Sequence, residues 1–342
     1  MMNLSFEQGP IRPVDEADSL LIRTTRGCPW NRCSFCSLYE GMQFSVRSVE
    51  SIKKDIRAAK DYFDGHSFET CFLQDGDSFV MPTKNLIDVL QTLKKAFPSL
   101  KRISSYGRAQ TMVKKNQSAM NEIFNAGLNK LYCGMESGSL EVLKKVKKGI
   151  TPESIIKSAD MARQAGMDTT QFIILGLGGT QLSDRHATET AKVLNRINPD
   201  TIRLLTLGVK TGSDLDQQMK NHTFTLPSEA QMISEQRLLL QNIEGITSHY
   251  ANHHSVDLLL EVRGQLPDDK ERLLGILDRF LSLTPAMQTN FILGRRLGYY
   301  RFLSDQENDL NFQFVDKQIE KIQQSDPDSF EDIFHNLRNK VI

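Results

Sequence analysis

Hydrophobic and polar positions follow two alternating patterns along the first 209 residues. Short apolar runs of strand length alternate with longer segments in which apolar side chains recur every three or four residues, as on one face of a helix. The runs predict six strands, at residues 19–28, 69–77, 100–108, 129–139, 168–179 and 201–209. The helical spacing predicts helices at residues 48–63, 83–97, 111–127, 139–148, 152–166, 183–198 and 227–243, and again from about Pro267.

Strands that alternate with helices in this way predict a parallel sheet with crossover helices. The segments 69–74 and 171–175 are almost uniformly apolar, as expected for strands covered on both faces. The predicted fold class is therefore α/β, a partial (β/α)6 TIM-like barrel with a mostly helical C-terminal extension. We expect three parts: a lead-in at residues 1–18, the barrel core at 19–212 and the mainly helical extension or cap at 213–342.

Polar and glycine-rich clusters come directly after the predicted strands. They are a cysteine-rich segment at residues 26–36, the turn Asp75-Gly76-Asp77, and residues 104–108, 134–138 and 176–179. The carboxyl ends of parallel strands meet at one edge of a sheet or barrel, where active sites form. The sequence therefore predicts a functional site built from these clusters.

Composition narrows the classes of partner. The 42 basic and 42 acidic residues cancel, so no global basic field favours nucleic acid. No apolar run approaches the roughly 20 residues of a membrane span, and the first residues lack the pattern of a signal peptide. Five cysteines, an odd number, favour a reducing compartment over disulfides. We therefore expect a cytoplasmic protein with no membrane association, for which nucleic acid is an improbable partner.

Three of the cysteines, Cys28, Cys33 and Cys36, lie within nine residues. Iron–sulfur clusters are normally held by four thiolates, so three thiolates leave one iron free for a ligand that is not protein. Zinc is the alternative, but a structural zinc site needs a fourth ligand. Cys71, Cys133 or a histidine such as His66 would have to supply that fourth ligand. From the spacing alone, both metals stay open.

The segment RGCPWNRCSFC resembles the cluster loop of the radical S-adenosylmethionine (radical SAM) superfamily. That family has the spacing Cys-x3-Cys-x2-Cys with an aromatic residue before the third cysteine, and Phe35 occupies this place. The first interval here is one residue longer. The segments FLQDGDSF, GMESGSLEVLKKVKKG and FIILGLGGT are similar to later motifs of the branch that contains tRNA methylthiotransferases, the elongator catalytic subunit and coproporphyrinogen dehydrogenase. The resemblance extends from the first strand to the sixth.

This resemblance implies a 4Fe–4S cluster on Cys28, Cys33 and Cys36, with S-adenosylmethionine bound to the fourth iron. One electron from the reduced cluster would then cleave S-adenosylmethionine, and the resulting 5′-deoxyadenosyl radical would abstract hydrogen from a substrate. The contacts that the resemblance implies are Asp75, Gly76 or Asp77 for the methionyl amine, Ser105 and Glu136 for the ribose, and Phe35 and Gly176 for the adenine. The electron would come from a donor such as flavodoxin or ferredoxin.

The residues that contact the substrate are less well defined by sequence. Tyr106, Arg108 and Arg203 lie at strand ends and would either meet an anionic group of a small-molecule substrate or pair with a nearby carboxylate. His253, with His249 and His254, would either bind a second metal or serve as ordinary polar residues. Two alternatives remain beside a radical SAM enzyme of undetermined final reaction: a coproporphyrinogen-dehydrogenase-like oxidase, and a zinc-stabilised α/β binding or scaffold protein.

Overall fold

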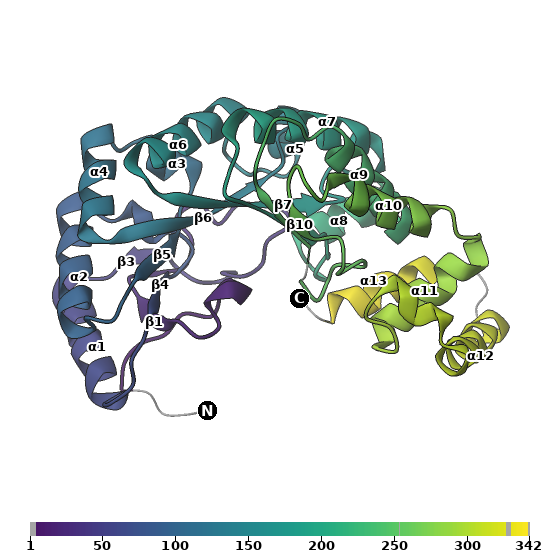
Figure 1. Cartoon of the computed structure of the whole chain (residues 1–342), viewed down its shortest axis with the longest axis horizontal. Helices are drawn as coiled ribbons and strands as arrows, with labels where there is room; N and C mark the ends of the chain where they lie inside the picture. Colours follow the sequence, from purple (N-terminus) through teal and green to yellow (C-terminus); the bar gives the residue numbers. More distant parts are fainter. Residues whose placement is uncertain (1–4, 253, 326–329, 341–342) are drawn as a thin grey trace. The chain divides into compact units, whose positions relative to one another are not determined.

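A computed structural model describes residues 5–252, 254–325 and 330–340. The chain divides into two compact units (Figure 1). The first consists of Met1–Met135 and Gly149–Gln171, and the second of Glu136–Lys148 and Phe172–Ile342. Strands β6 and β7 each contribute residues to both units, and residues 136–138 after β6 and 176–179 after β7 belong to the second unit.

The first unit is built on parallel strands. Their hydrogen-bonded order is β1 (Leu20–Arg23), β4 (Thr70–Gln74), β5 (Arg102–Tyr106) and β6 (Leu128–Glu136), followed by the beginning of β7 (Asp168–Leu175). The pairs β1–β4, β4–β5 and β5–β6 are all parallel. A separate antiparallel ribbon joins β2 (Thr25–Arg26) to β3 (Ser45–Val46).

Helices cover one face of these strands. They are α1 (Val49–Tyr62), α2 (Thr83–Ala96), α3 (Ala109–Met112), α4 (Gln117–Ala126) and α6 (Pro152–Ala165), with short 3-10 turns η1 (Val14–Glu16) and η2 (Ser78–Val80). Helices α1, α2 and α4 lie side by side (Figure 1). Their apolar faces pack on alternate strand residues, including Cys71, Leu73 and Ile103, in one hydrophobic core. This burial holds the strand ends in place and so fixes the loops that follow them.

The opposite face of the same strands is polar and aromatic. The buried carboxylate of Glu16 accepts hydrogen bonds from the Ser104 hydroxyl at 2.9 Å and the Tyr132 hydroxyl at 2.7 Å. The ring of Phe72 lies 6.0 Å from that of Tyr132. A charged group is stable at this depth because several donors satisfy it.

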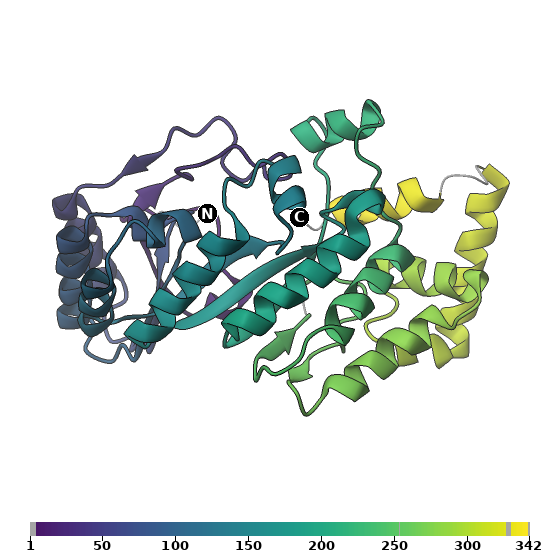
Figure 2. The ribbon, with the colours of Figure 1, turned by 90° about the horizontal axis from the view of Figure 1, so that it is seen from above.

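The second unit contains the end of β7, then β8 (Thr201–Thr206), β9 (His249–Ala251) and β10 (Gly264–Gln265). Strand β9 is parallel to β8, and β10 is antiparallel to β9. Its helices are α5 (Leu140–Lys145), α7 (Gly179–Ile197), α8 (Asp214–Lys220), α9 (Glu229–Gln241), α10 (Lys270–Leu281), α11 (Pro285–Leu297), η3 (Leu303–Glu307), α12 (Asp309–Ser325) and α13 (Phe330–Asn339). Helix α9 packs between α7 and α10 (Figure 2).

The predicted α/β class with a mostly parallel sheet is confirmed, and all six predicted strands are present. Two details were wrong. The helix expected at residues 111–127 is two helices, because the Asn116 side chain caps the N-terminus of α4 by accepting from the Ala119 N–H at 2.8 Å. The sequence also gave no sign of β9 and β10, which are too short to show a period. The division at residues 1–18, 19–212 and 213–342 stays a prediction.

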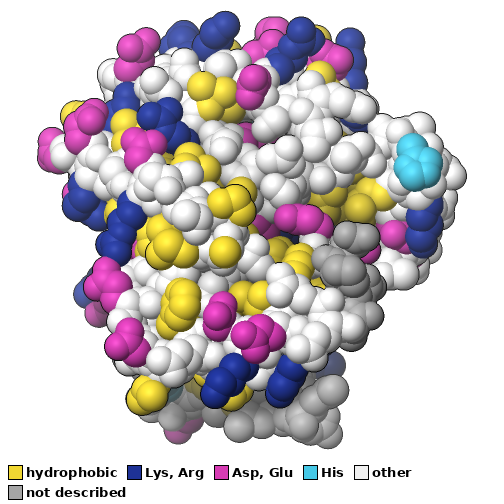
Figure 3. Space-filling model, turned by 90° about the vertical axis from the view of Figure 1, so that its right-hand side faces the viewer, with side chains coloured by type: hydrophobic (Ala, Val, Ile, Leu, Met, Phe, Trp, Pro, Cys, Tyr) yellow, Lys and Arg dark blue, Asp and Glu magenta, His cyan; other side chains and the backbone are white. Residues whose placement is uncertain are grey.

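Charged side chains of both signs are interspersed on the face drawn in Figure 3. This mixture agrees with the zero formal net charge, and that face presents no extended field of one sign. Among the described residues, no helix combines the length and the apolar character needed to cross a membrane.

Candidate active site

The three clustered cysteines lie on one loop that begins directly after β2. Cys28, Cys33 and Cys36 are each partly exposed. Because β1 and β2 lead into the loop, it follows the carboxyl end of a parallel strand, the usual place of active sites in α/β folds. Solvent exposure makes these thiols accessible for metal binding.

The turn after β4 packs against the start of this cysteine loop. The Gly76 N–H donates to the Gly27 carbonyl at 3.3 Å, and Oδ2 of Asp75 accepts from the Gly27 N–H at 3.0 Å. A Cβ placed on Gly76 would lie 3.3 Å from the Cβ of Cys28 and 3.0 Å from the ring of Tyr39. Two of the predicted clusters, from the ends of β1 and β4, are therefore in direct contact within the first unit.

An arginine from β1 neutralises the buried carboxylate of this turn. Oδ2 of Asp75 accepts from Nη2 of Arg23 at 2.5 Å and from Nε at 3.1 Å. Nη1 of Arg23 also donates at 2.8 Å to Glu7, which binds Arg26 in turn. A buried charge is stable only when it is paired, so Arg23 enables Asp75 to fix the first residue of the cysteine loop.

The second aspartate of the turn is also buried. Oδ2 of Asp77 accepts from the Thr111 hydroxyl at 2.5 Å, whereas Oδ1 has no hydrogen-bond partner among the described groups. Burial raises the pKa of Asp77 to about 7, although the Thr111 hydroxyl and the Arg108 guanidinium act in the opposite direction. Of Asp75, Gly76 and Asp77, only the glycine is partly exposed, so the turn presents its backbone rather than its carboxylates.

Tyr39 closes the cysteine loop from its C-terminal side. Its carbonyl accepts from the Asn31 side chain at 2.9 Å. Burial raises the pKa of the Tyr39 phenol, and the nearby Asp75 carboxylate and the Cys28 and Cys36 thiols add to this effect. The phenol therefore stays neutral, and it lies in the same neighbourhood as two of the three cysteines.

Arg108 packs on the tryptophan of the cysteine loop. Its guanidinium carbon lies 5.7 Å from the centre of the Trp30 ring, and that of Arg32 lies 5.3 Å away. A Cβ placed on Gly149 would overlap the same ring at 2.3 Å. The two arginine contacts are of the cation–π kind, and that of Arg108 places a predicted substrate residue against the cysteine loop. Phe35, the predicted adenine contact, is half-buried in that loop.

Tyr106 and Ser105 lie on opposite faces of β5. The Tyr106 ring packs 5.0 Å from Phe72 and 6.3 Å from Tyr132. Because successive side chains alternate along a strand, Ser105 points to the other face. It is fully buried there, and its hydroxyl donates to the Tyr106 carbonyl at 2.8 Å. Ser104 is the serine that shares a face with Tyr106, so the predicted ribose role of Ser105 has no support from its position.

In the second unit, Glu136 ends β6 in a left-handed conformation with φ of 61°. It is 8% exposed, and its Oε1 accepts from Nζ of Lys148 at 2.7 Å. A non-glycine residue in this region is uncommon and often marks a functional site. Lys148 was not singled out from the sequence.

Gly176, the predicted adenine contact, begins the turn after β7 with φ of 82°. Its N–H donates at 2.7 Å to Oε1 of Glu235, a residue of α9. Oε2 of Glu235 accepts from the Ser183 hydroxyl at 2.6 Å. Burial raises the pKa of Glu235, against the opposing effect of His186. A helix beyond the predicted barrel core therefore holds this turn.

The remaining predicted substrate residue, Arg203, is buried in β8. Burial raises the pKa of the Asp257 carboxyl to about 7, and the nearby Arg203 guanidinium acts in the opposite direction. Oδ1 of Asp257 accepts from the Thr206 hydroxyl at 3.1 Å. Of the two roles foreseen for Arg203, its surroundings favour a partnership with this acidic group.

Two of the three histidines, His249 and His254, lie in described parts of the chain. His249 belongs to β9, contrary to the loop that the sequence suggested. Nδ1 of His254 accepts from the Val256 N–H at 3.3 Å. His253 lies outside the described residues. A second metal site at this cluster stays a prediction.

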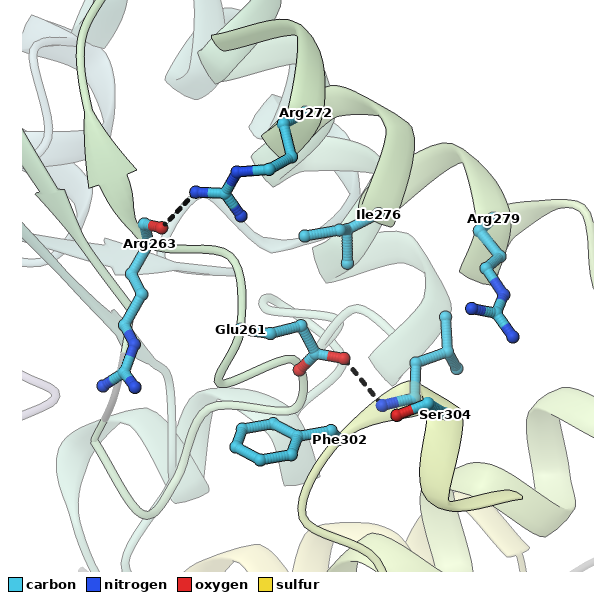
Figure 4. Close-up of a pocket in the computed structure, with 8 residues that line it drawn as sticks. Glu261, Arg263, Arg272, Ile276, Arg279, Phe302 and Ser304 are labelled. Atoms are coloured by element: carbon cyan, nitrogen blue, oxygen red, sulfur yellow. Dashed lines mark hydrogen bonds between the residues drawn. The ribbon is translucent and has the colours of Figure 1, made fainter. Parts of the chain in front are cut away.

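A cavity of about 520 Å³ lies elsewhere in the second unit (Figure 4). It is lined by Glu261, Arg263, Arg272, Ile276, Arg279, Phe302, Leu303 and Ser304. Glu261 points into it and accepts from the Leu303 N–H at 2.6 Å, while Arg272 turns to the Arg263 carbonyl at 2.9 Å (Figure 4). Arg279 already pairs with Glu307 at 2.5 Å. Arg272 and Arg279 are therefore engaged with other groups of the protein.

The donor set fits an iron–sulfur cluster better than the zinc alternative. Among the described residues, no three or more histidine, cysteine, aspartate or glutamate side chains surround a point where a single ion could bind. A 4Fe–4S cluster does not require this, because each thiolate binds a different iron. Cys71 is fully buried in the hydrophobic core, and His66 packs 4.4 Å from the Phe68 ring. A thiol buried in the core does not suit the fourth ligand of a zinc site on the exposed cysteine loop.

Comparison with known proteins gives a family for this chain. A family model described as the radical SAM superfamily matches residues 22–194, half of the chain. An uncharacterised methyltransferase of Pyrococcus horikoshii is 30% identical over 158 residues, which are 46% of this chain and 32% of that protein. Bacteriochlorophyllide d C-8(2)-methyltransferase of Chlorobaculum tepidum is 30% identical over 162 residues, 45% of this chain and 35% of that protein.

Among solved structures, coproporphyrinogen III oxidase from Escherichia coli, a radical SAM enzyme, is similar with a TM-score of 0.52. The two share 18% sequence identity, and the match covers 65% of this chain and 50% of the oxidase. At this identity the likeness concerns the fold alone. The chain spans about a third of the length of each of the two methyltransferases that it matches.

Proposed function

The chain belongs to the radical SAM superfamily, whose enzymes use a 4Fe–4S cluster and S-adenosylmethionine, and we propose that it is an enzyme that cleaves S-adenosylmethionine reductively. In that chemistry, an electron from the cluster breaks a carbon–sulfur bond of the sulfonium and yields methionine and a 5′-deoxyadenosyl radical, which abstracts hydrogen from a substrate. The observation that carries the proposal is the loop of three partly exposed thiols at a strand end, packed on the turn after β4.

The cysteine loop is the proposed cluster-binding site. Cys28, Cys33 and Cys36 would hold three irons. Arg23 and Asp75 would keep the start of the loop in position through the hydrogen bond from the Gly27 N–H to Oδ2 of Asp75 at 3.0 Å. The longer first interval would be accommodated by a loop in which Trp30 packs on Arg108 and the Asn31 side chain donates to the Tyr39 carbonyl at 2.9 Å.

The turn after β4 is the proposed contact of the methionyl amine. Both aspartate carboxylates of this turn are buried and bonded within the protein. An ammonium would therefore be met by backbone carbonyl groups near Gly76, with the buried carboxylates adding a favourable field. This refines the expectation from sequence, which left open whether Asp75 or Asp77 makes the contact.

Glu136 and Gly176 are the proposed contacts of the ribose and the adenine. Glu136 has a fixed carboxylate because Lys148 pairs with it at 2.7 Å. Gly176 is buried and has a left-handed backbone conformation in which a side chain would be strained. The catalytic core is proposed at residues 19–212, with 213–342 as a supporting extension.

Methyl transfer is a second candidate for the final reaction. Both curated relatives at 30% identity are named methyltransferases, and the matches cover 46% and 45% of this chain. The fold likeness to coproporphyrinogen III oxidase lends no comparable support to a porphyrin substrate, because identity is 18%. Enzymes of this superfamily need a reductant; we propose a flavodoxin or ferredoxin for this role, and the cytoplasm as the location.

Cluster content tests the proposed binding site. After anaerobic loading with iron and sulfide, the wild-type protein should contain about four irons and four sulfides per chain and absorb in the visible region. Cys28→Ala, Cys33→Ala and Cys36→Ala should each lose most of that absorption. Cys71→Ala is the matched control, because Cys71 is buried in the core; it should keep the cluster. Retention of the full cluster in all three loop variants would contradict the assignment.

A further inference from the structure

We propose that His186 and Glu235 are positioning residues for the nucleoside half of S-adenosylmethionine. They join the turn after β6 to the turn after β7, where the proposed ribose and adenine contacts lie. The inference rests on the proposed function. It adds two buried side chains that no motif contains, one of them on helix α9 beyond the residues matched by the family model.

His186 links the two turns through its two ring nitrogens. Nδ1 lies 2.8 Å from the hydroxyl of Ser137, and Nε2 lies 3.0 Å from the carbonyl of Ile174. A carbonyl can only accept, so Nε2 carries a hydrogen and donates to it. With a hydrogen on Nε2 only, the ring accepts from the Ser137 hydroxyl at Nδ1. This tautomer satisfies both turns with one buried side chain, since His186 is 1% exposed.

Ser137 connects His186 to the backbone of the turn that follows Glu136. Its hydroxyl oxygen accepts from the Ser139 N–H at 3.0 Å while its proton goes to His186. The neighbouring Gly138 N–H donates to the Thr190 hydroxyl of α7 at 2.8 Å. A Cβ on Gly138 would lie 2.5 Å from the Glu189 carbonyl, so the turn and α7 are in close contact.

Glu235 holds the second turn. Its Oε1 accepts from the Gly176 N–H at 2.7 Å and lies 3.6 Å from Nε2 of His186. Its Oε2 accepts from the Ser183 hydroxyl at 2.6 Å. Both oxygens are used, and the side chain is 1% exposed. The left-handed φ of Gly176 is thereby fixed by a hydrogen bond to its own N–H.

These contacts make the positions of Glu136 and Gly176 depend on the same pair of buried residues. A site must be held within about 0.5 Å of its productive geometry, and supporting hydrogen bonds supply that precision. Loss of either residue should therefore weaken the binding of the nucleoside more than it disturbs the cluster, which the proposed function assigns to the cysteine loop of the first unit.

The test compares two buried glutamates of one helix. Glu235→Leu removes the acceptor for Gly176 at similar volume, whereas Glu235→Gln keeps an acceptor and should rescue. Glu229→Gln is the matched control, because Glu229 is also 1% exposed and pairs instead with Arg296 at 2.7 Å and Arg338 at 2.9 Å. His186→Asn is a second test variant. It keeps a polar group near the position of Nδ1 but loses the N–H that donates to the Ile174 carbonyl.

The measurement is the dissociation constant of S-adenosylmethionine, and of 5′-methylthioadenosine, for anaerobically cluster-loaded protein. Glu235→Leu and His186→Asn should bind both ligands about tenfold more weakly, with an unchanged visible spectrum of the cluster. Glu235→Gln and Glu229→Gln should stay within about twofold of wild type, even though Glu229→Gln lowers the melting temperature.

Binding within twofold of wild type in folded Glu235→Leu and His186→Asn would overturn the inference and leave the proposed function intact. An equal loss of affinity in Glu229→Gln would also overturn it, because general destabilisation would then explain the effect. A wild-type protein that loads a cluster but binds neither ligand would contradict the proposed function itself.

Discussion

The turns after β4 and β7 both depend on a buried carboxylate that accepts from a backbone N–H, but the two carboxylates have different partners. In the first turn, Asp75 holds the Gly27 N–H at 3.0 Å and is paired with Arg23 at 2.5 Å. In the second, Glu235 holds the Gly176 N–H at 2.7 Å and is satisfied by a serine hydroxyl and the nearby His186.

The difference shows two ways to fix a ligand-binding loop at a strand end. The first carboxylate is paired with an arginine, and removal of this arginine would leave a buried acidic group without its cation. Without an arginine, burial raises the pKa of Glu235, and the second turn depends on acceptor oxygens more than on charge. The first turn should therefore be sensitive to loss of the cation, and the second to loss of the acceptor.

The largest effect is expected from Arg23→Met. This change keeps the aliphatic volume but leaves the fully buried Asp75 carboxylate without its cation. Removal of one partner of a buried pair costs about 3–5 kcal/mol of unfolding free energy. Guanidinium chloride unfolding of the wild type and the variant measures this difference.

Arg26→Met is the matched control for that prediction. Arg26 binds the same Glu7 at 2.7 Å, but its side chain is 43% exposed. An exposed pair contributes about 1 kcal/mol at most. Equal losses in the two variants would show that the buried pair does not set the first turn apart.

A smaller effect concerns the pH dependence of stability. Burial raises the pKa of Asp77 in the first unit and of Asp257 in the second to about 7. Their ordinary value is 3.8, so between pH 4 and 7 the folded state binds more protons than the unfolded state. Each group therefore stabilises the fold below pH 4, and this contribution is lost as pH rises to about 7.

In Asp77→Asn and in Asp257→Asn, the free energy of unfolding should fall less steeply with rising pH than in wild type, by at most about 1.4 kcal/mol per pH unit. Thermal unfolding from pH 4.5 to 8 would show it as a smaller fall in melting temperature in each variant than in wild type. A steeper fall in either variant would mean that its carboxyl is charged in the folded protein over this range.

Much of the fold and part of the site followed from sequence because the signals are local. Apolar runs placed all six parallel strands, since each is buried by helices on at least one face. The cysteine loop and the acidic turn are contiguous segments with fixed composition. Because they follow parallel neighbouring strands, their contact within the first unit could be anticipated.

The residues that hold these turns could not be found in the same way. Arg23 lies in an otherwise apolar strand, which is the one signal that it has a buried partner. Glu235 and Gly176 are 59 positions apart in the sequence, and Lys148 and Glu136 are 12 positions apart. Such pairs depend on tertiary packing. Alternation along β5 places Ser104 and Ser105 on opposite faces but does not show which face meets a ligand, so the ribose contact of Ser105 stays a prediction.

The most direct test of the central claim is the anaerobic incubation of cluster-loaded protein with dithionite and S-adenosylmethionine, followed by chromatography for 5′-deoxyadenosine and methionine. The wild-type protein should form both products in equal amounts, and variants that lack Cys28, Cys33 or Cys36 should form neither. A fully loaded wild-type protein that leaves S-adenosylmethionine intact, or a loop variant that forms 5′-deoxyadenosine at the wild-type rate, would contradict this account.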